Sequence, residues 1–440
     1  MLAIEAKLKG SQDQYTSLDS AIRTAQFIRN KCLRSWMDNR GVNRNELQKL
    51  CAVLAKDTST PWTKKLNSQA RQAAADRAWQ GIVRFYENCK NPAIKKKGYP
   101  KFKKYNRSVE YKNSGWSLSA DRRQITFTDG FNAGTFDLWT SRDLVWYSEQ
   151  QIKRVRVVSR ADGYYCQFLV DIQRSDPHEY TGSVTGIDLG LKEFYTDSNG
   201  KTVDNPRYLR KAEKRLKRLQ RNGGLKWANA FAHRPPRLSR RYKKPTKKGQ
   251  GQSKRYHKAR IQIAKQHLKI SRQRKDRAIK DALALVQSND LVVYENLKVS
   301  NMVKNHKLAK SISDASWYQF CQWVAYYAKL HDIVCVAVPP HFTSQDCSNC
   351  GKRVQKSLST RTHSCPHCHT VLDRDHNAAK NILAKGLNLL AELIKSTVGH
   401  TGINAQGEDD RWLVNGDVSH LSQLIELGIG QSLESPSKEF

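Results

Sequence analysis

The chain has 440 residues and a formal net charge of +37, with 77 Lys and Arg against 40 Asp and Glu. This length is enough for two or three domains with buried cores. So large an excess of cations is typical of proteins that bind polyanions, most often nucleic acid, and an acidic membrane surface is the weaker alternative. No apolar run is long enough to span a membrane and the N-terminus lacks the apolar core of a signal peptide, so we expect a soluble, cytoplasmic protein.

Two kinds of pattern fill the first 180 residues. Apolar and polar residues alternate over residues 2–8 and again in short runs between 109 and 172, which predicts the strands of an antiparallel barrel or sandwich. Over residues 11–92, apolar residues recur every three or four positions, which predicts three helices. Asn43 and Glu46 have the spacing of a capping box at the start of the second helix. We therefore predict two parts, a β-barrel and a helical module inserted in it: residues 1–10 with 93–180, and residues 11–92.

The loop after the third helix, residues 95–104, has the sequence KKKGYPKFKK. Gly98 and Pro100 break regular structure within it. Lysines interleaved with Tyr and Phe are suited to hold phosphates and stack bases. A solvated basic linker explains the same composition equally well, and the sequence leaves both interpretations open.

A second basic region extends from residue 214 to residue 275 and contains no Asp or Glu. Its middle, near residues 223–251, is rich in Gly, Pro and Lys, so we predict two helices on either side of a basic loop. A run of basic residues often lies on the surface in contact with water alone and binds nothing. A run of this length in so basic a chain favours contact with a phosphate backbone.

Beyond residue 180 the pattern becomes that of a mixed α/β sheet. The predicted order is three strands, a long helical region, a fourth strand, a helix, a fifth strand, an insertion and a last helix. This is the order of an RNase H-like fold, in which the first strand is central. We assign residues 181–340 and 371–397 to this domain and residues 341–370 to the insertion.

Three carboxylates lie in or at the ends of the predicted strands and helix that this fold would bring together. Asp188 lies within the first strand, Glu295 ends the fourth and Asp375 opens the last helix, so the fold would bring them together. Clustered carboxylates repel one another unless cations neutralise them, and hard oxygen ligands select Mg²⁺ or Mn²⁺. Two such ions would suit phosphodiester hydrolysis. Asp375 is also a candidate helix N-cap, Asp373 is a rival for its role, and Glu295 has the alternative of a lysine ion pair.

The insertion contains two Cys-x-x-Cys pairs, Cys347 with Cys350 and Cys365 with Cys368. This spacing predicts a closed tetrahedral zinc site with a structural role. Nearby histidines are possible competitors, but four thiolates already complete the site: His363, His367 and His369.

These motifs together resemble the TnpB family, the OrfB-type proteins of bacterial insertion sequences, which are related to compact type V CRISPR effectors. The resemblance extends to about residue 397. Its most specific points are five short motifs: GYPKFK at 98–103, GIDLG at 186–190, VYENL at 293–297, TSQDCSNCG at 343–351 and DRDHNAAKNI at 373–382.

The resemblance implies an α+β multidomain protein: a helical recognition module inserted in a wedge-like β-barrel, then a RuvC nuclease domain that carries a four-cysteine zinc finger. It also implies an RNA-guided DNA endonuclease that works with a guide RNA from the transposon end on double-stranded target DNA beside a short flanking motif, in the bacterial cytoplasm with the nucleoid. By position, the RuvC acids are Asp188, Glu295 and Asp375, with Mg²⁺ or Mn²⁺ as their metal. A transposase acting directly in strand transfer and a guided DNA-binding protein without cleavage are the alternatives.

The last segment, residues 398–440, reads as an acidic tail. Between residues 401 and 440 there are seven acidic residues against two basic ones. We expect disorder, with competition for a basic nucleic-acid channel as the alternative.

Overall fold

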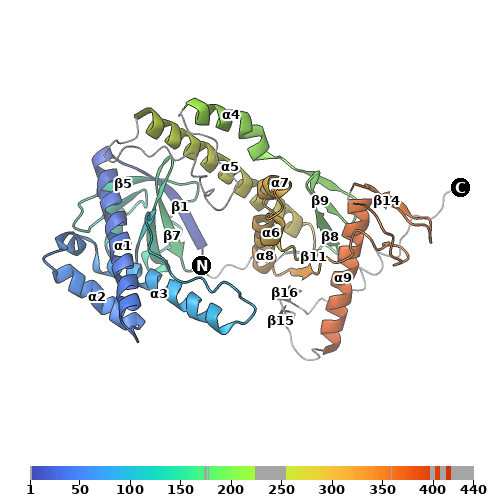
Figure 1. The fold of residues 1–440 in the computed structure, drawn as a ribbon, viewed down its shortest axis with the longest axis horizontal. Helices are drawn as coiled ribbons and strands as arrows, with labels where there is room; N and C mark the ends of the chain where they lie inside the picture. Colours follow the sequence, from blue (N-terminus) through green and yellow to red (C-terminus); the bar gives the residue numbers. More distant parts are fainter. Residues whose placement is uncertain are drawn as a thin grey trace, which may run out of the picture. The chain divides into compact units, whose positions relative to one another are not determined.

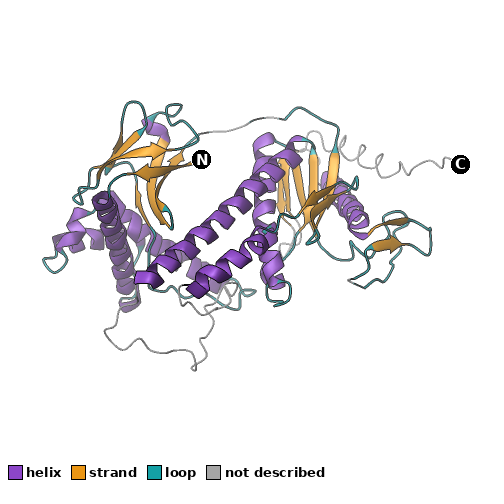
Figure 2. Ribbon diagram, turned by 90° about the horizontal axis from the view of Figure 1, so that it is seen from above, coloured by secondary structure: helices purple, strands orange, loops and turns teal. Residues whose placement is uncertain are grey.

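The computed structural model describes most of the chain: residues 2–172, 176, 178–222, 254–357, 359–396, 402–406 and 413–417. The chain divides into two compact units, Met1–Arg174 and Ser175–Phe440 (Figures 1 and 2). The predicted basic loop near 223–251 and most of the predicted tail lie outside the described residues.

Three helices follow the first strand of unit 1, as predicted: α1 (Gln12–Asp38), α2 (Arg44–Lys56) and α3 (Ser68–Lys90). The capping box of α2 is confirmed, because Asn43 accepts from the N–H of Glu46 while the Glu46 side chain accepts from that of Asn43. A short 3-10 helix, η1 (Pro61–Lys65), separates α2 from α3. The helices bury their predicted apolar faces in one core with the sheet of this unit.

Seven strands form an antiparallel sheet in unit 1, in the order β2-β6-β7-β1-β5-β4-β3. The edge strands β2 (Ser108–Tyr111) and β3 (Trp116–Leu118) are joined by only four residues, although a flat sheet would place its edges about 29 Å apart. The sheet therefore curls until it is nearly closed, so of the two predicted forms it is barrel-like and not a sandwich. The other strands are β1 (Leu2–Lys9), β4 (Gln124–Phe127), β5 (Gly134–Trp139), β6 (Ile152–Arg160) and β7 (Gly163–Val170). A 3-10 turn, η2 (Glu149–Gln151), precedes β6.

Unit 2 is built on a mixed sheet with its first strand, β8 (Val184–Leu189), near the centre. β8 pairs antiparallel with β9 (Glu193–Asp197) and parallel with β11 (Leu291–Glu295), and β11 pairs parallel with β12 (Val334–Val338). β10 (Thr202–Asp204) lies beside β9. As the sequence pattern predicted, the sheet is mixed and its first strand lies near the centre.

Helices cover both faces of this sheet. One face packs against α5 (Lys254–Gln287) and α8 (Trp317–His331), and the other packs against α9 (Arg374–Ser396). The described part of the basic region forms the two predicted helices, α4 (Tyr208–Asn222) and α5. Two short helices that the sequence pattern did not predict follow β11: α6 (Val299–Met302) and α7 (Ala309–Ala315).

The insertion extends past its predicted limit, and ten residues of the predicted tail form strands. A small hairpin of β13 (Thr362–Ser364) and β14 (Val371–Asp373) carries the insertion three residues past the predicted boundary. In the tail, β15 (Gly402–Gln406) and β16 (Leu413–Asp417) extend the large sheet, with β16 antiparallel to β12. The prediction of a disordered tail is therefore wrong for these ten residues. Their main chain occupies hydrogen-bonding groups that β12 would otherwise leave open at a sheet edge.

Candidate active site and metal centre

Asp188 and Glu295 come to the same end of neighbouring strands. The parallel register of β8 and β11 pairs Ile187 with Tyr294, so the next residue of each strand lies at the same level. Side chains alternate along a strand, which puts Asp188 on the side of Val184 and Glu295 on the side of Leu291. Both of these apolar residues belong to the cluster that includes α9. The two carboxylates therefore lie on the sheet face that α9 covers.

The helix α9 packs closely on this face of the sheet (Figure 1). A Cβ atom on Gly186 would lie 2.4 Å from the carbonyl oxygen of Ala379, so only glycine allows this approach. Gly386 plays the same part on the helix, since its Cβ would lie 2.5 Å from Cγ2 of Val293. Asp188, two residues from Gly186, is thereby held near the start of α9.

Asp375 lies in the first turn of α9 and is not its cap. The Oδ1 atom of Asp373 accepts a hydrogen bond of 2.8 Å from the Asp375 main-chain N–H, so the capping role belongs to Asp373. The side chain of Asp375, 13% exposed, instead meets two guanidinium groups. Arg374 donates to its Oδ1 at 2.9 and 3.1 Å, and Arg361 lies 3.5 Å from its Oδ2.

The electrostatics of these three acids favour a bound cation. Burial raises the pKa of Asp188 well above its ordinary value, and the charges of Glu295 and Asp375 raise it further. Burial also raises the pKa of Glu295, which is 8% exposed. Buried oxygen donors of this kind, with the charged form of Asp188 disfavoured by its neighbouring carboxylates, suit Mg²⁺ or Mn²⁺. The carboxylate oxygens lie farther apart than the cysteine sulfurs. Among the described residues, only the four cysteines form a group whose ligand atoms all lie within 4.8 Å of one another.

Thr343, which sequence reasoning missed, connects the insertion to this site. Its buried Oγ1 donates a hydrogen bond of 2.5 Å to Oε1 of Glu295 and partly offsets the rise of that pKa. Thr343 lies four residues before Cys347, at the start of the insertion. Because the partner is distant in sequence, no local pattern indicated this contact.

Two asparagines of α9 fix the same segment to the helix. Asn381 donates to the carbonyl oxygens of Thr343 and Asp346, at 2.8 and 2.7 Å. Asn377, fully buried, donates to Asp346 at 2.8 Å and accepts from the N–H of Ser348 at 2.9 Å. The insertion is therefore attached to the helix that carries Asp375 and to the strand that carries Glu295.

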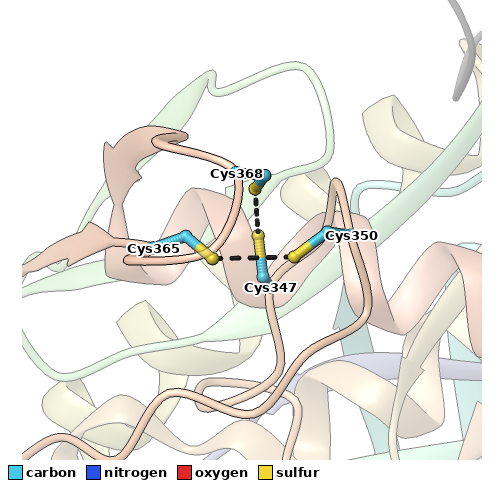
Figure 3. Close-up of side chains that lie close together, drawn as sticks. All are labelled: Cys347, Cys350, Cys365 and Cys368. Atoms are coloured by element: carbon cyan, nitrogen blue, oxygen red, sulfur yellow. Dashed lines mark hydrogen bonds between the residues drawn. The ribbon is translucent and has the colours of Figure 1, made fainter.

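The four cysteines converge as the sequence predicted (Figure 3). The Sγ atoms of Cys347 and Cys368 lie 3.6 Å apart, and so do those of Cys350 and Cys365. Four sulfurs at about 2.3 Å from a tetrahedral zinc ion would be separated by about 3.8 Å, whereas a disulfide needs about 2.05 Å. The donor set and its geometry therefore fit zinc, and none of the three nearby histidines belongs to the group.

One of the thiols is already favoured as a thiolate. Hydrogen bonds from the hydroxyl and the main-chain N–H of Thr370 lower the pKa of Cys368 to about 5. The hydroxyl lies 3.2 Å from the sulfur. Because zinc binds the deprotonated form, this contact suits a ligand sulfur.

Comparison with known proteins links the chain to one group. Residues 167–247 match the family OrfB_IS605, described as "Probable transposase", and residues 317–382 match "Cas12f1-like, TNB domain". A protein of Streptomyces pristinaespiralis named "Putative RNA-guided DNA endonuclease" is 28% identical over 88% of this chain and 89% of its own length. "Putative RNA-guided DNA endonuclease InsQ" of Escherichia coli (strain K12) is 27% identical over 77% and 80%. This chain belongs to the TnpB/OrfB family.

The two family matches contain parts of the candidate site of this TnpB-family chain, and Glu295 lies in neither. The first contains Asp188, and the second contains the four cysteines and Asp375. The solved structure titled "Cryo-EM structure of the Cas12f1-sgRNA-target DNA complex" aligns with 84% of this chain and 83% of its own, at a TM-score of 0.48 and 14% identity. Among the described residues, no helix has both the length and the apolar character to cross a membrane.

Proposed function

We propose that this protein is an RNA-guided DNA endonuclease that cleaves target DNA beside a short flanking motif. The observation that carries the proposal is the meeting of Asp188 and Glu295 on the sheet face covered by α9, with Asp375 in the first turn of that helix. Support comes from the two relatives named as RNA-guided DNA endonucleases, which match more than three-quarters of the chain. In this proposal guide pairing reads the sequence, and the protein reads backbone shape and the flanking motif.

The reaction assigned to this RuvC-like site is the hydrolysis of a phosphodiester. Asp188, Glu295 and Asp375 would hold Mg²⁺ or Mn²⁺, which when bound activate water and stabilise the departing 3′ oxygen. Thr343 orients Glu295 through its hydrogen bond, and Arg374 and Arg361 balance the charge of Asp375. The glycines at 186 and 386 keep α9 close enough for its first turn to join the strands.

The zinc at the four cysteines has a structural part in this proposal. All four ligand positions are filled by protein sulfurs, so no position is open for substrate. Its effect on the reaction would be indirect, through the segment from Cys347 to Thr343 that contacts Glu295.

A transposase that joins strands itself is the second candidate, because one matching family carries that description. The order of acids along this chain is Asp, Glu, Asp, whereas transposases with an RNase H-like triad usually run Asp, Asp, Glu. Strand-transfer products formed on transposon-end DNA without any RNA would favour this candidate.

The test uses the full chain purified from cells that also express the flanking transposon end, with the RNA that co-purifies. We expect this complex to cut a plasmid that matches the RNA, only with Mg²⁺ or Mn²⁺, and to leave a mismatched plasmid intact. Asp188→Ala should abolish cutting while guided binding of the plasmid persists. Full cutting by Asp188→Ala would refute the assigned chemistry, and guided binding without cutting by the unaltered protein would identify a binding protein without nuclease activity.

A further inference from the structure

The basic loop between α3 and β2 has neither helix nor strand, yet its main chain is held in place by side chains of α1. Gln26 donates to the carbonyl oxygens of Lys103 and Lys104, both at 2.9 Å. Asn30 donates to the carbonyl of Lys103 at 2.9 Å and accepts from its N–H at 3.0 Å. Helix side chains thus stand in for the pairing that a strand would give this segment.

A helix on the other side of the loop fixes its first half. Asn88 of α3 donates to the carbonyl oxygen of Lys97 at 3.0 Å. Gly98 follows with a φ of +75°, a conformation that suits glycine, and Pro100 is buried. A flexible solvated linker would not need any of these contacts, so they weigh against that interpretation.

The two aromatic rings in the loop serve as anchors. Tyr99 packs at 5.7 Å from the ring of Trp36 and at 5.2 Å from that of Phe85. Phe102 lies under the guanidinium of Arg34 at 5.7 Å. A further ring directly after the loop, Tyr105, is 85% exposed and makes no ring contact among the described residues.

The positive charges of the loop are presented without neutralisation. It contains six lysines and no acidic residue: Lys95, Lys96, Lys97, Lys101, Lys103 and Lys104. Within the part of the chain that the structure describes, none of them pairs with a carboxylate, and all but Lys97 are exposed. A fixed main chain that carries unpaired cations next to a free ring suits a phosphate backbone with an accessible base.

We propose that residues 101–105 bind an unpaired stretch of RNA, with Lys101, Lys103 and Lys104 at the phosphates and Tyr105 stacked on a base. Base pairs in a duplex hide their faces, so an exposed ring gains contact only from an unpaired strand. The choice of RNA rests on the proposed function, in which the guide is bound before any DNA is opened. The strand displaced from the target is the competing occupant.

The first experiment measures binding of a short labelled single-stranded RNA to the full chain over a range of salt concentrations. Changing Lys101, Lys103 and Lys104 together to Gln should make the log–log salt dependence shallower by about 2, since each phosphate contact on a single strand contributes about 0.7. The matched control removes the same charge from exposed lysines elsewhere in unit 1, Lys49→Gln, Lys56→Gln and Lys153→Gln, and should change the slope much less. Equal changes in both triple variants would refute a specific surface.

Tyr105→Leu should weaken binding of this RNA about tenfold without changing the salt dependence, because the ring carries no charge. Unchanged affinity would refute the stacking role.

A photo-crosslinking residue at position 105, in the complex with its co-purified RNA and a matching plasmid, identifies the occupant. We expect the crosslinked strand to be degraded by ribonuclease, whereas a crosslink to DNA would assign the surface to the displaced strand and overturn the proposal. These readouts do not depend on cutting, and Asp188→Ala protein should give the same crosslink. Loss of the RNA contact with cutting intact would refute this surface alone, and its presence without cutting would refute only the nuclease.

Discussion

The four-cysteine centre and the carboxylate site are assembled in opposite ways, although Cys368 of the first and Asp375 of the second are close in the sequence. The cysteines all lie between Cys347 and Cys368, and their sulfurs lie within 4.8 Å of one another. The carboxylates come from β8, β11 and α9, and only the packing of the helix on the sheet joins them. Mutual repulsion and burial work against the second site, as the raised pKa of Asp188 shows. Local spacing can therefore complete a structural metal site, whereas the candidate active site depends on the whole domain.

The most severe test of this contrast removes zinc ligands. Changing Cys347 and Cys350 to Ser should eliminate zinc binding and unfold the insertion, since the free energy of binding zinc is also the free energy of folding such a segment. Thr343 would then lose its position, so we expect cleavage to fall on the order of 100-fold. Metal analysis, hydrogen exchange over residues 341–373 and the plasmid assay measure the three effects.

The matched control for that variant is Cys89→Ser, which alters an exposed cysteine outside the group. It should leave zinc content and cleavage unchanged. If the double cysteine variant kept full cleavage, the two sites would be independent and the link through Thr343 would be refuted.

The loss of zinc ligands should unfold the insertion, whereas Asp188→Asn should modestly stabilise the metal-free protein. The folded-state pKa of Asp188 is raised, so its contribution to stability is present at low pH and is lost as the pH rises through that value. At neutral pH the uncharged amide should therefore raise the Tm of metal-free protein by about 2–5 °C, and the gain should shrink toward pH 4. Thermal unfolding in EDTA-washed buffer, with Asp373→Asn as the control, measures this. A lower Tm for Asp188→Asn at neutral pH would contradict the electrostatic account.

The mildest test concerns the connection between the two sites. Thr343→Val keeps the size of the side chain and removes the hydrogen bond that lowers the pKa of Glu295. The acid limb of the pH–rate profile should move to higher pH, with cleavage near neutral pH about tenfold lower. Thr343→Ser, which keeps the hydroxyl, should restore the profile. A rate loss with an unmoved acid limb in Thr343→Val would show that Thr343 acts only on stability.

Sequence reasoning succeeded where the signal was local. The period of the helical faces, the capping box at Asn43 and the two Cys-x-x-Cys pairs each lie within a few turns of chain, and each is present in the structure. The strand order of the mixed sheet was also predictable, because alternating strands and helices leave few arrangements.

What the sequence missed depends on residues that are distant along the chain. Thr343 and Asn381 show no local pattern, and their partners become neighbours only after α9 packs on the sheet. The acidic composition around Gly402–Gln406 and Leu413–Asp417 predicted disorder. These segments form strands because β16 pairs with the edge of β12 and β15 pairs with β16. Only the resemblance favoured Asp375 over its rival Asp373, and the hydrogen bond from the Asp375 N–H identifies Asp373 as the cap.

The most direct measurement compares Asp375→Asn with Asp373→Asn in the guided plasmid assay, with zinc content and plasmid binding monitored in both. Asn is as good a helix cap as Asp, so Asp373→Asn should cut at nearly the rate of the unaltered protein. Asp375→Asn should lose cleavage on the order of 10³-fold or more while it binds the matching plasmid normally. The reverse result, with Asp373→Asn inactive and Asp375→Asn active, would contradict the assignment of the active site.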